Sequence, residues 1–249
     1  MNKVFSIVLF PFTLIRFILV WLVTAFFATV VSIEYLRHKR PGTYKFWCQQ
    51  HWGRTVLFLL GLKVKRNNIV CDGYYLLMPN HRSYIDILIM AAYSPSAFVS
   101  KAEIGKWPII GPALKWNHAI LVQRDELRSL LGTMKLIKAS IENGLSVTVF
   151  PEGTTFAGPG TKTFKNGTFK IAAEQHINIV PCAIQYADKS MAWVGEDTLI
   201  PHVFSHFWKP VSRAEIKFGP PISGTDYQEL KTKTQQIINE LLGEPSQNH

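Results

Sequence analysis

The 249-residue sequence predicts an α/β protein, with a mixed sheet flanked by helices and an N-terminal membrane-associated helical segment. Short apolar runs alternate with helical stretches from Lys63 onward, which is typical of an α/β sheet domain. The composition is 47% hydrophobic and 18% charged, which excludes disorder as the dominant state. The first part of the chain is strongly apolar. We therefore expect residues 1–62 to form membrane-anchoring helices and residues 63–249 to form the α/β domain.

The N-terminal apolar run extends from Val4 to Ile33 and is interrupted by Pro11 and Arg16. Its uncharged part, residues 17–33, is at the short limit for a spanning helix, which needs about 20 residues. A cleaved signal peptide is disfavoured, because the run is too long and no small-residue cleavage site follows. The basic cluster at residues 37–40 favours the cytoplasmic face and anionic head groups. The sequence leaves open whether the segment spans the bilayer or lies in one leaflet.

Residues 44–60 alternate aromatic and aliphatic side chains with polar ones at helical spacing. This pattern, with Trp47 and Trp52, predicts an amphipathic helix at the membrane interface. The alternative is an ordinary helix that packs on the α/β domain. Gly61 is expected to end the helix.

The remaining elements follow from periodicity. We expect strands at residues 74–78, 97–99, 119–122, 145–150, 179–185 and 214–218. We expect helices at residues 84–93, 126–142, 168–175 and 226–242. The last helix begins with Thr225-Asp226-Tyr227-Gln228, which matches a capping box. Residues 243–249 are expected to fray.

Charge and cysteine content limit the partners and the compartment. The net charge of +10 indicates an acidic partner, which can be nucleic acid, anionic lipid or an acidic carrier protein. No nucleic-acid-binding motif is present, so nucleic acid is not an expected partner. Cys48, Cys71 and Cys182 are far apart and odd in number, without a Cys-x-x-Cys pair. This pattern indicates a reducing compartment and no structural zinc.

One candidate site lies where the first predicted α/β strand ends, at Asn80-His81. Asp86 follows His81 by five positions, in the first turns of the next predicted helix. Two groups on one face of a continuous helix are three or four positions apart, so this spacing places His81 in the loop. A carboxylate on one ring nitrogen fixes the tautomer and raises the basicity of the other nitrogen, which makes a general base. Taken alone, a structural histidine is the more common explanation.

A second candidate site lies where the predicted strand at 145–150 runs into Pro151-Glu152-Gly153-Thr154. Proline ends a strand, and glycine permits a tight turn or a close approach of the backbone to a ligand. The carboxylate of Glu152 could bind a hydroxyl or organise the loop. Taken alone, a plain strand-to-loop turn is the better explanation.

Together, the two sites resemble the first and third signature blocks of the glycerolipid acyltransferase family, which includes the 1-acylglycerol-3-phosphate acyltransferases. The blocks are the HX4D motif His81-x-x-x-x-Asp86 and Phe150-Pro151-Glu152-Gly153-Thr154. Val122-Gln123-Arg124 resembles the second block and Ile179-Val180-Pro181-Cys182-Ala183 the fourth. The resemblance covers roughly residues 74–222 and is specific, because four blocks occur in order.

The resemblance implies a membrane O-acyltransferase of lipid metabolism. It would move a fatty acyl group from an acyl thioester, either acyl carrier protein or CoA, to the free hydroxyl of a lysolipid. The favoured reaction converts 1-acylglycerol-3-phosphate to phosphatidic acid in phospholipid biosynthesis, with no cofactor and no metal. His81 would take the hydroxyl proton while Asp86 orients the ring. Backbone amides near the Glu152-Gly153 turn would hold the oxyanion. The implied substrate-binding residues are Lys101, Arg124, Glu152, Gly153, Thr154 and Lys165.

One position departs from the family pattern. Thr155 stands where many lysophosphatidate enzymes carry arginine, which leaves the head group open. A lyso-ornithine lipid is the alternative acceptor. A metal-dependent hydrolase using His81 and Asp86 as ligands lacks the further ligand cluster that such a site would need. A non-catalytic membrane scaffold is the remaining alternative. The positive net charge would attract the enzyme to an acidic acyl carrier protein and to an anionic membrane surface. We expect the enzyme at the cytoplasmic face of the inner membrane.

Overall fold

The structure is a computed structural model that describes residues 3–38, 44–67, 73–106, 119–122, 127–195 and 197–243. Its centre is a seven-stranded sheet with the strand order β1-β7-β6-β2-β5-β3-β4. The strands are β1 (Leu62–Arg66), β2 (Leu76–Pro79), β3 (Ala97–Lys101), β4 (Ile120–Val122), β5 (Val147–Thr148), β6 (Ile179–Tyr186) and β7 (Ser212–Phe218). Among the strands that the structure describes, β6 and β7 pair antiparallel and all other neighbours pair parallel. The predicted α/β fold with a mixed sheet is therefore confirmed.

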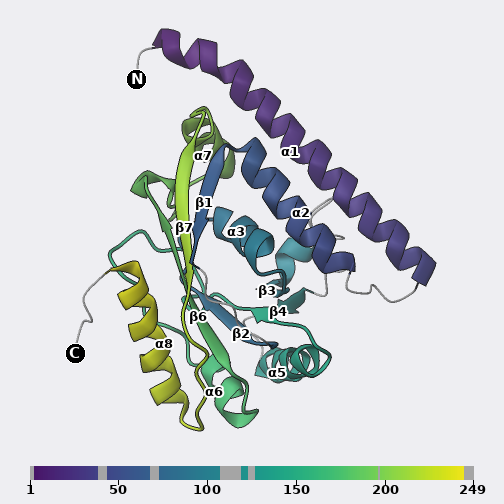
Figure 1. Cartoon of the computed structure of the whole chain (residues 1–249), viewed down its shortest axis with the longest axis vertical. Coiled ribbons are helices and arrows are strands. Elements are labelled where there is room, and N and C mark those ends of the chain that lie inside the picture. The colour runs from purple at the N-terminus through teal and green to yellow at the C-terminus, as the bar shows by residue number, and fades with distance from the viewer. Residues whose placement is uncertain are drawn as a thin grey trace.

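Helices cover both faces of the sheet (Figure 1). One core contains residues of α2 (Tyr44–Leu59), α3 (Ile85–Tyr93) and α7 (Leu199–His206). The other core contains residues of α5 (Leu127–Glu142), α6 (Gly167–Glu174) and α8 (Tyr227–Leu242). Two short 3₁₀ turns, at Ala102–Lys106 and Lys189–Met191, complete the described elements. Successive side chains of a strand point into the two cores in turn, so both faces of the sheet are buried. This burial explains why the strand sequences are nearly continuous apolar runs.

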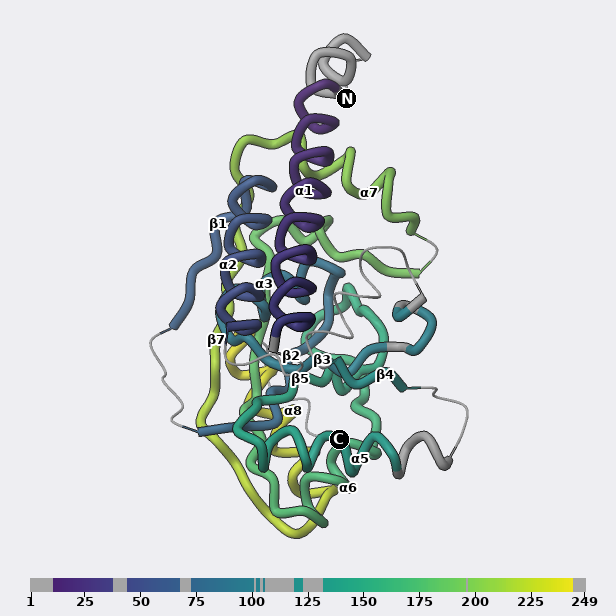
Figure 2. Tube along the Cα trace, turned by 90° about the vertical axis from the view of Figure 1, so that its right-hand side faces the viewer, coloured from purple at the N-terminus to yellow at the C-terminus, as the bar shows by residue number. Residues whose placement is uncertain are grey.

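The helix α1 (Lys3–His38) runs along the outside of the domain, beside α2 and as far as α7 (Figures 1 and 2). Its part from Pro11 to Arg37 is long and apolar enough to cross a membrane, with a mean hydropathy of 2.4. The indole nitrogen of Trp52 on α2 donates a hydrogen bond of 3.1 Å to the Thr24 hydroxyl of α1. Phe17 of α1 lies 6.4 Å from Phe204 of α7, between ring centroids. The helix is therefore attached to the domain at two places along its length.

The helix α2 shares its core with the α/β domain. Cys48, Val56 and Leu57 are buried, and a Cβ placed on Gly53 would lie 2.7 Å from the Ala92 backbone nitrogen of α3. Two possibilities were open for this segment from its sequence, a helix at the membrane interface and a helix that packs on the α/β domain. The buried contacts of α2 correspond to the second possibility. One face of α2 thus packs on α3, while Trp52 contacts α1. The division of the chain at residue 62 into anchoring and catalytic segments stays a prediction.

Besides the two 3₁₀ turns, one described strand and one described helix were not predicted. The edge strand β1 has the sequence Leu-Lys-Val-Lys-Arg and only one fully buried residue, so its apolar signal is weak. The helix α7 is short and contains Pro201 near its start. The strand predicted at 145–150 is shorter in the structure, where β5 contains Val147 and Thr148.

The helix α8 is capped at its N-terminus by the Asp226 side chain, which accepts hydrogen bonds from the amides of Gln228 and Glu229.

Candidate active site

Four parallel strands deliver the predicted site segments to one edge of the sheet. In the register, Leu77 of β2 and Phe98 of β3 both pair with Thr148 of β5. The carboxyl ends of these strands therefore lie side by side, and β4 ends next to Lys101 of β3. Ligands of α/β sheets bind at this edge, where strands lead into loops. The segments that follow β2 and β5 carry His81 and Glu152, respectively.

The imidazole of His81 is held by the carboxylate of Asp86. The two are joined by a contact of 2.8 Å between Nδ1 and Oδ2. The ring also stacks on Phe150, with 4.1 Å between ring centroids. Because Nδ1 faces the carboxylate, Nε2 is the ring atom that would exchange a proton with a substrate. The spacing of five positions works as expected, since His81 lies before the helix and Asp86 in its first turn.

Asp86 is itself fixed by three further donors. Its Oδ2 accepts from the backbone amides of Arg82 at 2.6 Å and Ser83 at 2.8 Å, and Oδ1 accepts from the Tyr186 hydroxyl at 2.5 Å. Burial and the charge of Asp86 raise the pKa of Tyr186 well above its usual value, so the phenol remains a donor. Tyr186 was not predicted, because it lies 100 positions away at the end of β6.

Replacing Tyr186 by phenylalanine should leave the fold intact and alter the pH dependence of the enzyme. The phenol withdraws negative charge from Asp86, and without it the carboxylate would stabilise a protonated His81 more strongly. We expect the acidic limb of the kcat/KM profile to move to higher pH. The measurement is a pH–rate profile, with Tyr75→Phe as the matched control. An unchanged limb would contradict a direct role of Tyr186 in positioning and tuning the pair.

Glu152 supports His81 from the neighbouring loop. Its Oε1 accepts from the His81 backbone amide at 2.9 Å and its Oε2 from the Lys162 amide at 3.0 Å. Burial raises the pKa of Glu152, although these two amides oppose the shift. Both carboxylate oxygens thus accept hydrogen bonds from backbone amides. Through these bonds Glu152 holds the loops that contain His81 and Lys162. A substrate-binding role for Glu152 stays a prediction.

Gly153 and Lys165 lie together at the same loop. Gly153 has φ of 71°, and its amide donates to the Phe150 carbonyl at 3.1 Å. That amide closes a turn, and the oxyanion role expected for backbone amides near it stays a prediction. A Cβ on Gly153 would lie 2.8 Å from Cε and 3.1 Å from Nζ of Lys165. The Lys165 ammonium is therefore placed beside the turn, while Thr154 is exposed next to it.

The other two predicted cations are less fully described. The backbone of Lys101 ends β3, but its side chain lies outside the described residues. Arg124 also lies outside them, two positions beyond the end of β4. Their roles, and those of Gly153, Thr154 and Lys165 toward substrate, stay predictions.

Arg82 and Asn80 flank His81 and hold its loop. The Arg82 guanidinium donates to the carbonyls of Phe156 at 2.9 Å, Gly158 at 2.6 Å and Gly160 at 2.7 Å. The Asn80 side chain exchanges two hydrogen bonds with the backbone of Ile184 on β6. No sequence pattern indicates the role of Arg82, because its partners are backbone carbonyls of a distant loop.

A histidine oriented by a buried carboxylate at the carboxyl edge of an α/β sheet is the arrangement of a general-base enzyme, and the apolar helix α1 associates it with membranes. A family model described as Acyltransferase matches residues 61–185, half of the chain. The chain belongs to the acyltransferase family and is an O-acyltransferase.

Relatives of known name support this assignment. The chain is 26% identical to lyso-ornithine lipid O-acyltransferase of Rhizobium meliloti, over 80% of this chain and 73% of that protein. It is 31% identical to 1-acyl-sn-glycerol-3-phosphate acyltransferase of Neisseria meningitidis, over 55% of each chain. The fold is similar to that of the 1-acyl-sn-glycerophosphate acyltransferase PlsC from Thermotoga maritima, with a TM-score of 0.74 at 17% identity, covering 98% of this chain and 97% of that one. The resemblance inferred from the four sequence blocks is confirmed.

Proposed function

We propose that this enzyme transfers a fatty acyl group from an acyl thioester to the free hydroxyl of a lysolipid, with His81 as the general base. The observation that carries the proposal is the 2.8 Å contact between Nδ1 of His81 and Oδ2 of Asp86. Three other hydrogen-bond donors hold the Asp86 carboxylate in place. This arrangement turns Nε2 into the proton acceptor.

The reaction follows from this geometry. Nε2 of His81 takes the hydroxyl proton of the lysolipid as the oxygen attacks the thioester carbonyl. The tetrahedral intermediate collapses, the carbon–sulfur bond breaks, and the imidazolium returns its proton to the departing thiolate. Asp86 stabilises the transient imidazolium through Nδ1. The activated thioester makes an acyl-enzyme unnecessary, and no step requires a metal or a cofactor.

For the acceptor, we propose lysophosphatidate, which the reaction would convert to phosphatidate. A phosphate monoester needs more than one cation in a partly desolvated site. Lys165 lies beside the Gly153 turn. Lys101 is the last residue of β3, and Arg124 comes two positions after the end of β4, which pairs with β3 at the same edge of the sheet. Several relatives are named as acyltransferases of 1-acyl-sn-glycerol-3-phosphate.

Lyso-ornithine lipid is the second candidate acceptor, and two observations favour it. Thr155 replaces a cation that many lysophosphatidate enzymes carry. The matches to lyso-ornithine lipid O-acyltransferases also extend over more of the chain, at 80% for the Rhizobium meliloti protein and 90% for that of Brucella abortus. A competition assay that offers both lysolipids to the wild-type enzyme separates these candidates. Preference for lyso-ornithine lipid would reject the phosphate assignment, and acylation of neither would reject the reaction.

Replacing Arg124 by alanine should raise the KM for lysophosphatidate about tenfold or more, because hydrogen bonds to charged groups contribute roughly 1.5–3 kcal/mol. The KM for the acyl thioester should change much less. Steady-state kinetics with each substrate varied in turn measure both effects. Lys135→Ala, on the exposed part of α5, is the matched control for loss of one positive charge. Equal changes in the two KM values would contradict a specific role of Arg124 at the head group.

We further propose that the enzyme works at the cytoplasmic face of the inner membrane and that α1 lies in one leaflet. Thr24 and Phe17 of α1 contact the domain at α2 and α7, so a helix crossing the bilayer would carry both elements into it. The opposite face exposes Leu14, Ile15, Ile18, Leu22 and Phe26. The positive charge of the protein supports attraction to anionic lipid and to an acidic acyl carrier protein, with acyl-CoA as the other possible donor.

A further inference from the structure

The outer face of α7 and the residues that follow it is apolar. Ile200, Phe204 and Trp208 recur every four positions and so lie on one side of the helix and its extension. Ile200 has 60% of its surface exposed, and Leu199 and Val211 are also exposed. The opposite side, with His202 and Val203, is buried. The outward face of a surface helix on a soluble domain is normally polar, so this pattern requires an explanation.

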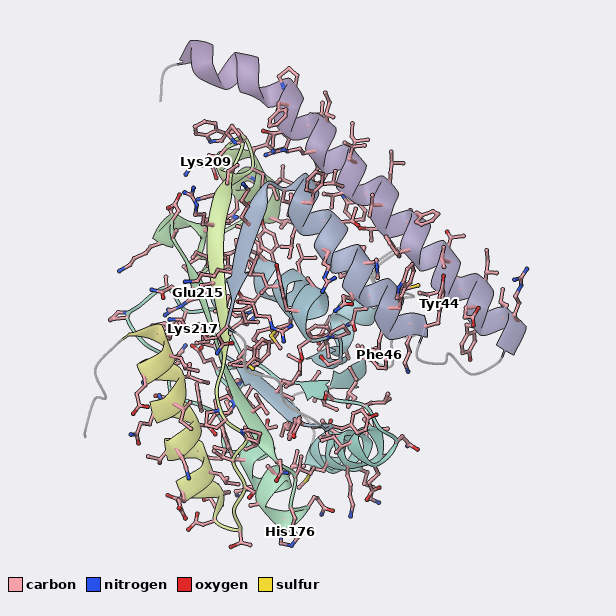
Figure 3. All side chains as sticks on the ribbon, viewed as in Figure 1. Tyr44, Phe46, His176, Lys209, Glu215 and Lys217 are labelled. Atoms are coloured by element: carbon pink, nitrogen blue, oxygen red, sulfur yellow. The ribbon has the colours of Figure 1, made fainter. Side chains whose placement is uncertain are left out.

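This apolar face adjoins α1, which contacts α7 through its domain-facing side. Phe204 contacts Phe17 of α1, and the guanidinium of Arg16 donates to the carbonyls of Phe207 at 2.9 Å and Lys209 at 2.7 Å. These carbonyls lie just beyond the last turn of α7, so Arg16 ties the end of α7 to α1. Figures 1 and 2 show α7 beside the N-terminal half of α1, and Figure 3 places Lys209 there. The two helices therefore lie side by side, and both carry exposed apolar side chains.

We propose that Leu199, Ile200, Phe204, Trp208 and Val211, here called the α7 surface, insert into the lipid bilayer beside α1. The proposal rests on the proposed function, for which it names the route of the acceptor. An aromatic residue such as Trp208 and flanking cations are typical of segments at a membrane interface. Lys189 is exposed next to Ser190, whose hydroxyl contacts His206 of α7 at 3.1 Å. An anionic lipid surface complements this charge.

The buried side of α7 connects the α7 surface to the catalytic loop. Nδ1 of His202 lies 3.1 Å from the Tyr84 hydroxyl, and Tyr84 stands between His81 and Asp86 in sequence. The Trp193 amide, which precedes α7, donates to the Arg82 carbonyl at 2.9 Å. Insertion of α7 thus sets the catalytic loop at the lipid boundary. The acceptor hydroxyl can then reach His81 while its acyl chain remains in the bilayer.

Spin labelling of the full chain in anionic lipid vesicles tests the proposal without turnover. A nitroxide spin label is attached to Ile200→Cys in a protein that also carries Cys71→Ser. The accessibility of this label to oxygen is compared with its accessibility to a water-soluble nickel complex. Cys48 and Cys182 are buried and should not react. We expect the label at position 200 to report lipid immersion, as a label on Leu22→Cys of α1 should. Leu136→Cys on α5, which is 52% exposed in the native protein, is the aqueous control.

The proposal would be overturned if the label at position 200 were accessible to the nickel complex, like the control label. It would also be overturned if the label at position 200 were shielded from both reagents, because that result indicates a protein partner on this surface. A second measurement compares Ile200→Glu with Leu136→Glu. The ratio of acyl transfer on vesicle-embedded lysolipid to transfer on a short-chain, water-soluble lysolipid should fall about tenfold in Ile200→Glu only, because a charged side chain at position 200 opposes burial of the α7 surface in lipid. An unchanged ratio would contradict the proposal, whereas the label result stands even if the reaction assignment fails.

Discussion

Replacing His81 by alanine should reduce acyl transfer by ~10²–10⁴-fold, which is the usual range for loss of a general base. The proton of the acceptor hydroxyl would then have no base at the position that Nε2 occupies. The protein should still fold, because the His81 side chain is partly exposed and its backbone bonds to Glu152 and Phe156 do not need the imidazole. Initial rates of lysolipid acylation, together with thermal unfolding of the variant, provide the measurement.

Asp86→Asn is the companion variant. An asparagine carbonyl can take the place of Oδ2 and accept from His81, Arg82 and Ser83, while its amide faces the Tyr186 oxygen. The variant should therefore fold but lose the charge that stabilises the imidazolium, and we expect a residual rate between those of wild type and His81→Ala. An active His81→Ala enzyme would show that the base has been assigned to the wrong residue.

The second large effect is expected from Arg82→Met, which keeps a long apolar stem but removes the guanidinium. Three backbone carbonyls of the 156–160 loop would lose their charged donor. Hydrogen bonds to charged groups contribute roughly 1.5–3 kcal/mol each, so we expect the free energy of unfolding to fall by roughly 2–4 kcal/mol, allowing for the partial exposure of the site. Chemical denaturation of the wild-type and variant proteins measures the change.

The same variant should lose roughly tenfold to a hundredfold in kcat. Phe156 of the released loop donates its amide to the His81 carbonyl, and small displacements of a catalytic group have effects of this size. Lys162→Met, at an exposed position of the same segment, is the control. Wild-type stability in Arg82→Met would mean that the loop is held by other contacts, and the positioning role of Arg82 would be rejected.

Local patterns predicted much of the sheet. The apolar run at 179–185 became β6, residues 179–186, because both faces of this central strand are buried. The edge strand β1 escaped prediction since its lysines face solvent and dilute the apolar signal. The helix α7 was missed because a short segment with Pro201 lacks helical periodicity. The buried packing of α2 depends on a close approach of Gly53 to α3, which the spacing of aromatic residues does not report.

The site was predictable where its partners are neighbours in sequence. His81 and Asp86 are five positions apart, and the chain direction at a strand end brings them together. Tyr186 and Arg82 act on residues 100 and 78 positions away, so only the fold reveals them, and the Lys162 amide reaches Glu152 across a loop of ten positions. The substrate-binding role of Glu152 stays a prediction, and both of its oxygens accept from backbone amides, a geometry that no local pattern specifies.

Acyl transfer by His81 is tested by thiol release from an acyl thioester, offered to the purified protein in detergent with and without a lysolipid. We expect thiol to be released only when the lysolipid is present, in equal amount with the acylated lipid, and His81→Ala to abolish both. Release without lysolipid would define a thioesterase, and no release with either lysolipid would indicate a membrane scaffold. Either result would contradict acyl transfer by His81 as the function of this site.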